Sequence, residues 1–324
     1  MTPETLLWII FWSTFFIVSA VDYYVTSHRT TIISVNTALR WTALWVAIAL
    51  SFGAVVFFVH PRGEQLAILY LSGYLTEYSL SVDNLFVFIL IFSLMGVKNV
   101  AQPKLIKLGI YLSIVLRIVF ILFGIALLHR FAWLIYVFGA LLIWTAWKMV
   151  TADEEESVHP DKNILYRLAS KFLPVHAEAQ ETKLLFTRFG GKLCITPLFL
   201  VFLVIGSTDV LFAIDSIPAI MGISQDPFVV LTSNVFAVLG LNSLFFAIRG
   251  IMGLFKFLKH GVSVILFFIG AKMMAGIYHP IEAWFKENNS VSLLVIVSVL
   301  FVSIVLSVWH DRLIARRAKD KNIS

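Results

Sequence analysis

Four acidic residues lie inside long apolar stretches of the chain, in two pairs with the same spacing. Glu77 and Asp83 stand six residues apart, and so do Asp209 and Asp215. An ionisable group is costly to bury in an apolar segment, and such groups mark ion or substrate pathways in membrane proteins. The paired spacing therefore indicates chemistry rather than packing.

The charge of these acids needs compensation. An aspartate at the centre of a membrane helix costs about 2.5–3.5 kcal/mol on insertion scales, whereas each leucine or phenylalanine returns only about 0.3–0.6 kcal/mol. Arg117 is the one basic residue deep inside an apolar stretch. One guanidinium cannot neutralise four carboxylates, so the residues predict a site for protons, a metal cation, or both.

The side chains near the acids carry oxygen ligands. Besides the carboxylates, the candidate ligands and supporting groups are Asn84, Asn234, Asn242, Ser81 and Ser216. All eight histidines lie outside the middle of an apolar stretch. An oxygen-only ligand set favours Mg²⁺, Ca²⁺, Mn²⁺, Na⁺ or H⁺ and disfavours copper and zinc.

Helix geometry restricts how the acids can share an ion. In a straight helix, residues six apart lie about 240° round and about 9 Å along the axis, too far for one ion to take both. Either the helices break or one site takes residues from both pairs. Pro218 favours a break, because proline clashes with the carbonyl of residue i−4, here Ile214, and frees it as a ligand beside Asp215.

The composition defines the elements that must hold these residues. The chain has 324 residues, of which 60% are hydrophobic and 14% charged, with one cysteine, and its mean hydropathy is +0.91. A water-soluble enzyme is excluded, since soluble domains have about a quarter charged residues. The net charge of +6 does not indicate nucleic acid, because the basic residues lie in short loops. One cysteine, Cys194, gives no sign of redox chemistry.

The apolar runs have the length of membrane-spanning helices, about 20 residues. Nine such runs are found, at 5–25, 41–59, 66–95, 107–128, 131–149, 193–222, 228–252, 259–278 and 291–310. The fold class is therefore all-α, a single polytopic membrane domain over 1–324. The first run follows Glu4 without a basic residue or a clear cleavage site, so we expect a retained span.

The distribution of basic residues predicts the orientation. With the N-terminus outside, twenty lysines and arginines lie on the inner side and four on the outer side. This bias predicts an N-out, C-in topology with nine spans. The one long loop, 151–192, is then cytoplasmic and holds an amphipathic segment from Asn163 to Pro174. Residues 291–324 form the last helix and a basic tail.

The acidic pairs belong to a longer internal repeat. Lys148 follows the first pair much as Lys272 follows the second, and Arg117 and Asn242 occupy comparable places between them. The two units, 66–150 and 193–278, enter the membrane from opposite sides. The sequence therefore predicts an inverted three-plus-three repeat, as in many secondary transporters, with residues 1–60 forming two peripheral helices.

The motifs resemble the TerC family of integral membrane proteins, within the LysE-type transporter group. The resemblance lies in 73–88, in Thr208-Asp-Val-Leu-Phe-Ala-Ile-Asp-Ser-Ile-Pro-Ala219, in 226–234 and in 268–273, and it covers roughly 66–275. It implies metal-ion efflux, chiefly of manganese(II), across the bacterial inner membrane, and an association with tellurium resistance. It also implies a metal-ligand role for Glu77, Asp83, Asn84, Asp209 and Asp215.

The chain departs from the family pattern at two positions. Many family members have a glutamate where this chain has Gly206 and an arginine where it has Asn242. Losing a charge together with its counter-charge is electrostatically neutral, whereas losing one would strand the other. We hypothesise that this pair is auxiliary and that the four remaining acids suffice.

We therefore expect a cation exporter without enzymatic activity or a permanently bound cofactor, with Mn²⁺ or a similar hard cation as the transported ion. Its partners are the cation and the bilayer, and homo-oligomers or membrane-protein partners stay open. Three alternatives remain. One is a non-transporting scaffold or assembly protein, and another is an exporter whose substrate is Ca²⁺, an amino acid or an oxyanion. The third is an aspartyl protease using Asp83 and Asp215. The protease is disfavoured because neither aspartate has the expected Gly-x-Gly-Asp context.

Overall fold

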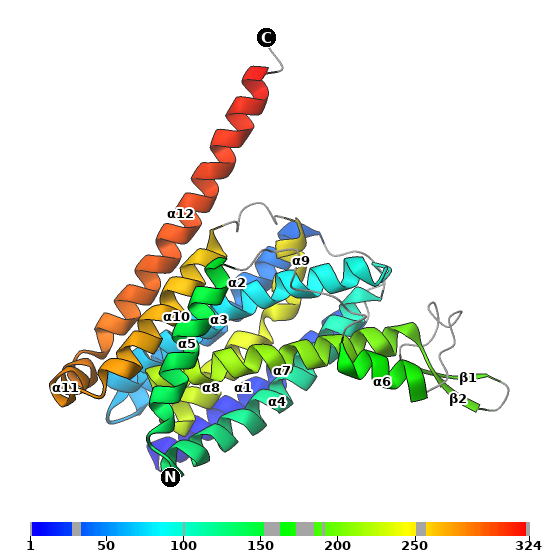
Figure 1. Cartoon of the computed structure of the whole chain (residues 1–324). Coiled ribbons are helices and arrows are strands. Elements are labelled where there is room, and N and C mark those ends of the chain that lie inside the picture. Colours follow the sequence, from blue (N-terminus) through cyan, green and yellow to red (C-terminus); the bar gives the residue numbers. More distant parts are fainter. Residues whose placement is uncertain are drawn as a thin grey trace.

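The computed structural model describes residues 2–27, 34–99, 101–151, 163–172, 185–189, 192–250 and 257–321. The described elements are α1 (Pro3–Ser27), α2 (Val35–Val59), α3 (Gly63–Leu94), α4 (Gln102–Arg130), α5 (Leu134–Thr151), α6 (Ile164–Phe172), β1 (Phe186–Phe189), β2 (Lys192–Ile195), α7 (Pro197–Ile223), α8 (Pro227–Leu239), α9 (Leu241–Gly250), α10 (Leu258–Ala275), α11 (His279–Glu287) and α12 (Asn289–Lys321). Figure 1 shows the bundle that they form.

The prediction of a polytopic helical membrane protein is confirmed. Among the described residues, eight helices are each long and apolar enough to cross a bilayer, and the bent pair α8–α9 makes a ninth span if it is counted as one. Apolar helices satisfy every backbone hydrogen bond internally, which a lipid environment requires. The N-out orientation stays a prediction.

The span formed by α8 and α9 is bent rather than straight. The axes of α8 and α9 differ by 44° at the break between them, where Gly240 lies. A Cβ atom at Gly240 would be 3.3 Å from Cβ of Trp45 in α2, and the indole of Trp45 donates a hydrogen bond of 3.2 Å to Ser243. The bend thus lies where α2 packs closely against this span.

The predicted break at Pro218 is wrong. Helix α7 runs continuously from Pro197 to Ile223 with Pro218 inside it. Membrane helices tolerate an internal proline where neighbouring groups compensate for the lost backbone hydrogen bond. Ile214 lies on an exposed face of this helix, with 50% of its surface accessible. A site shared between the two acidic pairs must therefore come from helix packing, not from a broken α7.

The segment before α7 was only partly predicted. The amphipathic helix is found as α6, and it lies beside α7, where Asn163 donates a hydrogen bond of 2.7 Å to Ser207. Residues 193–195, expected in a span, instead form strand β2, which pairs antiparallel with β1. Thr196 then caps the first turn of α7. The hairpin projects from one end of the bundle (Figure 1).

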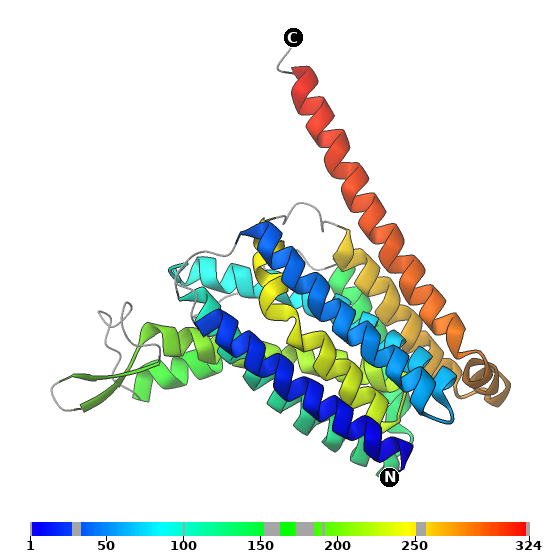
Figure 2. The same ribbon diagram turned by 180° about the vertical axis from the view of Figure 1, so that it is seen from behind.

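The helices of the two predicted repeats pack in matching pairs. In the predicted repeat, α3 corresponds to α7, α4 to α8 and α5 to α10. The contact between α3 and α8 is matched by the contact between α7 and α4. Likewise, the contact between α5 and α7 is matched by the contact between α10 and α3. Helix α3 also packs directly against α7, and α5 packs extensively against α10. Helices α1 and α2 cover one side of the bundle (Figure 2), while α12 lies beside α3 and α10 and extends beyond the other helices.

Candidate functional site

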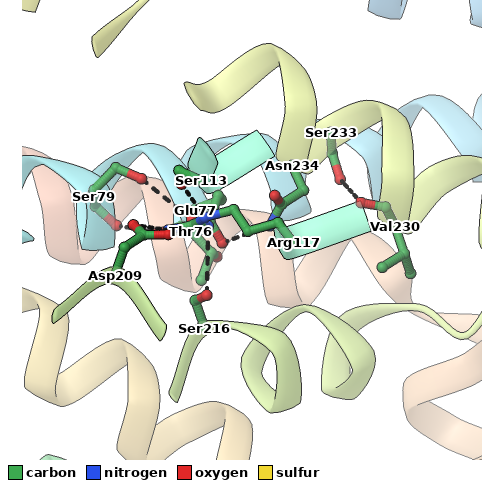
Figure 3. A network of polar contacts seen from close by, with 11 residues as sticks. Thr76, Glu77, Ser79, Ser113, Arg117, Asp209, Ser216, Val230, Ser233 and Asn234 are labelled. Atoms are coloured by element: carbon green, nitrogen blue, oxygen red, sulfur yellow. Dashed lines mark hydrogen bonds and ion pairs between the residues drawn. The ribbon is translucent and has the colours of Figure 1, made fainter. Parts of the chain in front are cut away.

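A buried ion pair joins the first acidic pair to α4. The Arg117 guanidinium contacts the Glu77 carboxylate, and each side chain is only 1% exposed. Glu77 also accepts hydrogen bonds from Ser81, at 3.2 Å, and from the amide of Asn234 in α8, at 2.9 Å. Three helices therefore converge on one carboxylate (Figure 3).

Asp209 brings the second acidic pair to the same arginine. Its Oδ1 atom lies 3.9 Å from a terminal nitrogen of Arg117, and its side chain is 6% exposed. Arg117 also donates to Ser113, at 3.1 Å, and to Ser216, at 3.4 Å. Arg117 thus bridges a carboxylate from each predicted repeat. Glu77, Arg117 and Asp209, with the side chains that contact them, form what we call the central cluster, in which one guanidinium faces two carboxyl groups.

Two buried oxygens of the central cluster, and one on the residue beside Glu77 in α3, have no hydrogen-bond partner among the described residues. They are Oδ2 of Asp209, Oδ1 of Asn234 and Oγ1 of Thr76. Buried polar atoms are nearly always hydrogen-bonded, so each exception calls for an explanation. Carboxylate, amide and hydroxyl oxygens are the ligands that hard cations prefer. Such a cation fits these atoms by chemical type.

The central cluster is not a preformed metal cage. In the ranges that the structure describes, no three His, Cys, Asp or Glu side chains gather closely enough to hold an ion. A cation here would use Asn, Ser or Thr oxygens in addition to Glu77 and Asp209. It would also compete with Arg117 for both carboxylates.

Asp215 lies apart from the central cluster. It accepts a hydrogen bond of 2.9 Å from Thr145 in α5, the helix that also carries Lys148. Because Asp209 and Asp215 are six positions apart, they lie on different sides of the continuous helix α7. The structure therefore joins Glu77 with Asp209 and directs Asp215 towards α5.

The remaining predicted residues fall in different places. The backbone of Asp83 belongs to α3, but its side chain lies outside the described part of the structure. Asn84 is half-buried in the same helix. Asn242 lies in α9, where its amide reaches the carboxylate of Asp22 in α1 at 3.4 Å. Asn242 is therefore linked to α1 rather than to the central cluster.

Sequence reasoning missed three residues near the acids: Ser113 and Thr145 make polar contacts, and Thr76 holds a buried hydroxyl without a partner among the described residues. Ser113 precedes Arg117 by four residues, so helical spacing alone would have placed the two side chains on one face. Thr76 is the neighbour of Glu77 in sequence. Thr145 carries no such signal, because its contact with Asp215 depends on how α5 packs against α7.

Gly206, where the resemblance leads us to expect a glutamate, lies against α4. A Cβ atom there would be 2.8 Å from Cδ2 of Leu112. We predict that Gly206→Glu lowers the free energy of unfolding by about 3 kcal/mol, because it buries a carboxylate without a counter-charge. Thermal unfolding in detergent measures this, with Gly206→Ala as the control for the steric part. Equal stability of the glutamate and alanine variants would contradict the electrostatic argument.

Comparison with known proteins identifies relatives over most of the chain. The family model "Integral membrane protein TerC family" matches residues 62–313. The chain is 40% identical over 293 residues to "Uncharacterized membrane protein STKORF319" of Myxococcus xanthus, covering 90% of this chain and 89% of that protein. It is 38% identical over 288 residues to "Putative membrane-bound redox modulator Alx" of Escherichia coli K12, covering 85% and 86%.

A mycobacterial protein, "Uncharacterized membrane protein Mb2742" of Mycobacterium bovis, is 36% identical over 306 residues, covering 90% of this chain and 76% of that protein. No solved structure matches the chain. The family model covers well over half of the sequence, including every helix of the central cluster. This protein therefore belongs to the TerC family of integral membrane proteins.

Proposed function

We propose that this protein is a carrier, not an enzyme, that exports a hard divalent cation, chiefly Mn²⁺, across the bacterial inner membrane. The observation that carries the proposal is the convergence of Glu77 and Asp209, from the two predicted repeats, on one buried arginine. Oδ2 of Asp209 and Oδ1 of Asn234, which have no hydrogen-bond partner among the residues that the structure describes, would add hard ligands. A membrane protein with such a site needs no permanently bound cofactor.

The charges suggest how an ion could enter and leave. Without a cation, Arg117 compensates Glu77 and Asp209 and keeps the cluster stable in an apolar bundle. A divalent cation carries more charge than a guanidinium, so it competes for the same carboxylates. Binding of the ion would shift Arg117 towards Ser113 and Ser216, to which it already donates hydrogen bonds. The arginine is then an internal counter-ion that returns when the ion leaves.

The matching helix pairs support an inverted repeat and alternating access. One pair breaks the match: α10 packs against α7, whereas α5 makes no comparable contact with α3 in the described parts of the chain. Two repeats that are related by symmetry but packed differently are what alternating access requires. With the predicted N-out orientation, this arrangement would place the central cluster between two alternating pathways.

Other functions have less support. A relative carries the name of a redox modulator, but Cys194, the one cysteine in this sequence, is buried and cannot form a disulfide within it. An oxyanion such as tellurite needs a free deep cation, and Arg117 already faces two carboxylates. A scaffold would gain nothing from ionisable groups at this depth.

Uptake of Mn²⁺ into inverted membrane vesicles tests the proposal. We expect uptake by the native chain and a loss of about tenfold or more in Asp83→Asn/Asp215→Asn, since intramembrane acids line ion pathways. This double variant tests the acids beside the central cluster, and Asp209→Asn tests the cluster itself. Asp226→Asn is the matched control, because Asp226 caps α8 and asparagine caps a helix equally well. Vesicles that contain folded protein and take up no Mn²⁺, with or without a pH gradient, would refute manganese export.

A further inference from the structure

A cavity of about 500 Å³ opens at one end of the bundle. It lies where α3 begins and where α4, α7 and α10 end, and its lining includes Gln65, Leu128, Ser224 and Lys272. On the predicted orientation this end faces the outside. Among the described residues, the charged side chains that line the cavity are Lys272 and Glu282, whose charges are of opposite sign. A cavity without net negative charge holds a divalent cation weakly, as a release route requires.

An apolar layer separates this cavity from the central cluster. It is formed by Ile121, Ile125, Leu128, Ala213, Ile217, Ile220, Met221 and Val230, all of them buried. Leu128 and Met221 belong to the layer and also line the cavity. The layer therefore forms the floor of the cavity.

The position of the layer follows from the helix registers. Ile121 is one turn nearer to the cavity than Arg117 in α4, and Val230 is one turn nearer than Asn234 in α8, about 6 Å in each case. In α7, Ile220 lies one turn beyond Ser216 in the same direction. Three helices thus place apolar side chains directly between the polar groups and the cavity.

Two glycines allow the layer to close tightly. A Cβ atom at Gly124 would lie 2.5 Å from Cε of Met221. One at Gly73 would lie 2.8 Å from Oγ of Ser233 in α8 and 3.1 Å from Cδ1 of Ile220 in α7. The bare backbones of α4 and α3 therefore admit the side chains of α7 against them. Met221 fills the gap with an unbranched, flexible chain, which can move aside at little cost.

We propose that this apolar layer, with Met221 as its movable part, is the outer gate of the transport path, and that the cavity is the vestibule through which the ion leaves. The inference rests on the proposed function for the identity of the ion. Apolar constrictions close a path by excluding water, because an ion cannot shed its hydration there. The structure is then closed towards the outside at the layer, with the central cluster occluded beneath it.

Thiol labelling tests the gate without measuring transport. The sequence holds one cysteine, so Cys194→Ser gives a background for single cysteines. Ser224→Cys probes the vestibule, and Ser216→Cys probes the central cluster. A charged, membrane-impermeant methanethiosulfonate reagent is applied to the outer face of intact cells. We expect Ser216→Cys to react about tenfold or more slowly than Ser224→Cys. The reagent reaches Ser216→Cys only while the layer is open, and the open state is a minor population.

Opening the layer should remove this difference. In Met221→Ala, we expect the Ser216→Cys probe to react about tenfold faster. The shorter side chain leaves the layer open, so the reagent no longer has to wait for a minor open population. Met95→Ala, the same change in the turn after the far end of α3, should leave the rate unchanged. If Met221→Ala fails to fold, loss of Ser224→Cys labelling would reveal it. Ile121→Ala then provides a second way to open the layer.

Equal labelling of both probes in the native background would overturn the gate, as would an unchanged Ser216→Cys rate in a folded variant of the layer. The labelling needs no transported ion. A protein that labels as expected but takes up no Mn²⁺ would therefore support the gate and refute the proposed substrate. The two proposals can thus fail separately.

Discussion

Arg117→Met is expected to lower the free energy of unfolding by about 3–5 kcal/mol, because it leaves a buried carboxylate without its partner. Glu77 is 1% exposed and cannot reach water to compensate. The hydrogen bonds from Ser81 and Asn234 would remain, but neither carries a charge. Thermal or denaturant unfolding in detergent, followed by size exclusion, measures the loss.

Two further variants make this result specific. Arg130→Met changes the same residue type at the exposed end of α4, and we expect an effect within about 0.5 kcal/mol. Arg117→Met/Glu77→Gln removes both charges and keeps a side chain that can accept hydrogen bonds from Ser81 and Asn234. It should be more stable than Arg117→Met alone. A double variant as unstable as the single one would contradict the ion-pair argument.

Asp209→Asn is expected to reduce Mn²⁺ uptake about 100-fold, a loss typical of groups that hold or orient a metal, while the protein stays folded. Asp209 is a weaker partner of Arg117 than Glu77 is: its nearest approach is 3.9 Å. Its Oδ2 atom has no hydrogen-bond partner in the described structure. The charge of Asp209 thus contributes little to the fold, and its replacement tests function more than stability.

The measurement is uptake by inverted vesicles, normalised to the amount of folded protein. Asp226→Asn again serves as the matched control, since it changes the same residue type at a helix cap. Normal uptake by Asp209→Asn would remove Asp209 from the ion site and leave its burial beside Arg117 unexplained. Together with Arg117→Met, this variant separates the groups that maintain the bundle from the groups that handle the ion.

Both results bear on the role of a single arginine in an acidic site. Arg117 is 1% exposed and lies between carboxylates from α3 and α7. Such a group lowers the affinity for a cation, because the ion must compete with it. An exporter benefits from moderate affinity, since the ion has to leave as well as bind. In the proposed carrier, the arginine therefore favours release of the cation as well as stabilising the folded bundle.

The sequence alone determined the class of protein and the location of its unusual residues. Apolar runs of about 20 residues define membrane helices because the thickness of the bilayer fixes their length. The acids were visible because a charge in such a run is costly wherever the chain folds. Both properties are local, so they can be read without knowing any contact between helices.

Only the tertiary structure decided which of these residues meet. The rotation of each helix and its partners bring Glu77, Arg117, Asp209 and Asn234 together, and turn Asp215 towards Thr145 instead. The tertiary structure also decided where a span bends. The sequence favoured a break at Pro218, whereas the structure bends at Gly240, where α2 packs closely.

The physical reason is that local signals describe the free energy of placing one segment in a membrane helix. The contacts of that segment depend instead on where the other segments lie. A proline inside α7 did not break the helix, because its effect depends on the neighbours that compensate for it. The apolar layer above the central cluster is made of ordinary isoleucine, valine and methionine side chains. Their types are those of any membrane helix, so only the packing of α4, α7 and α8 distinguishes a gate from the rest of the core.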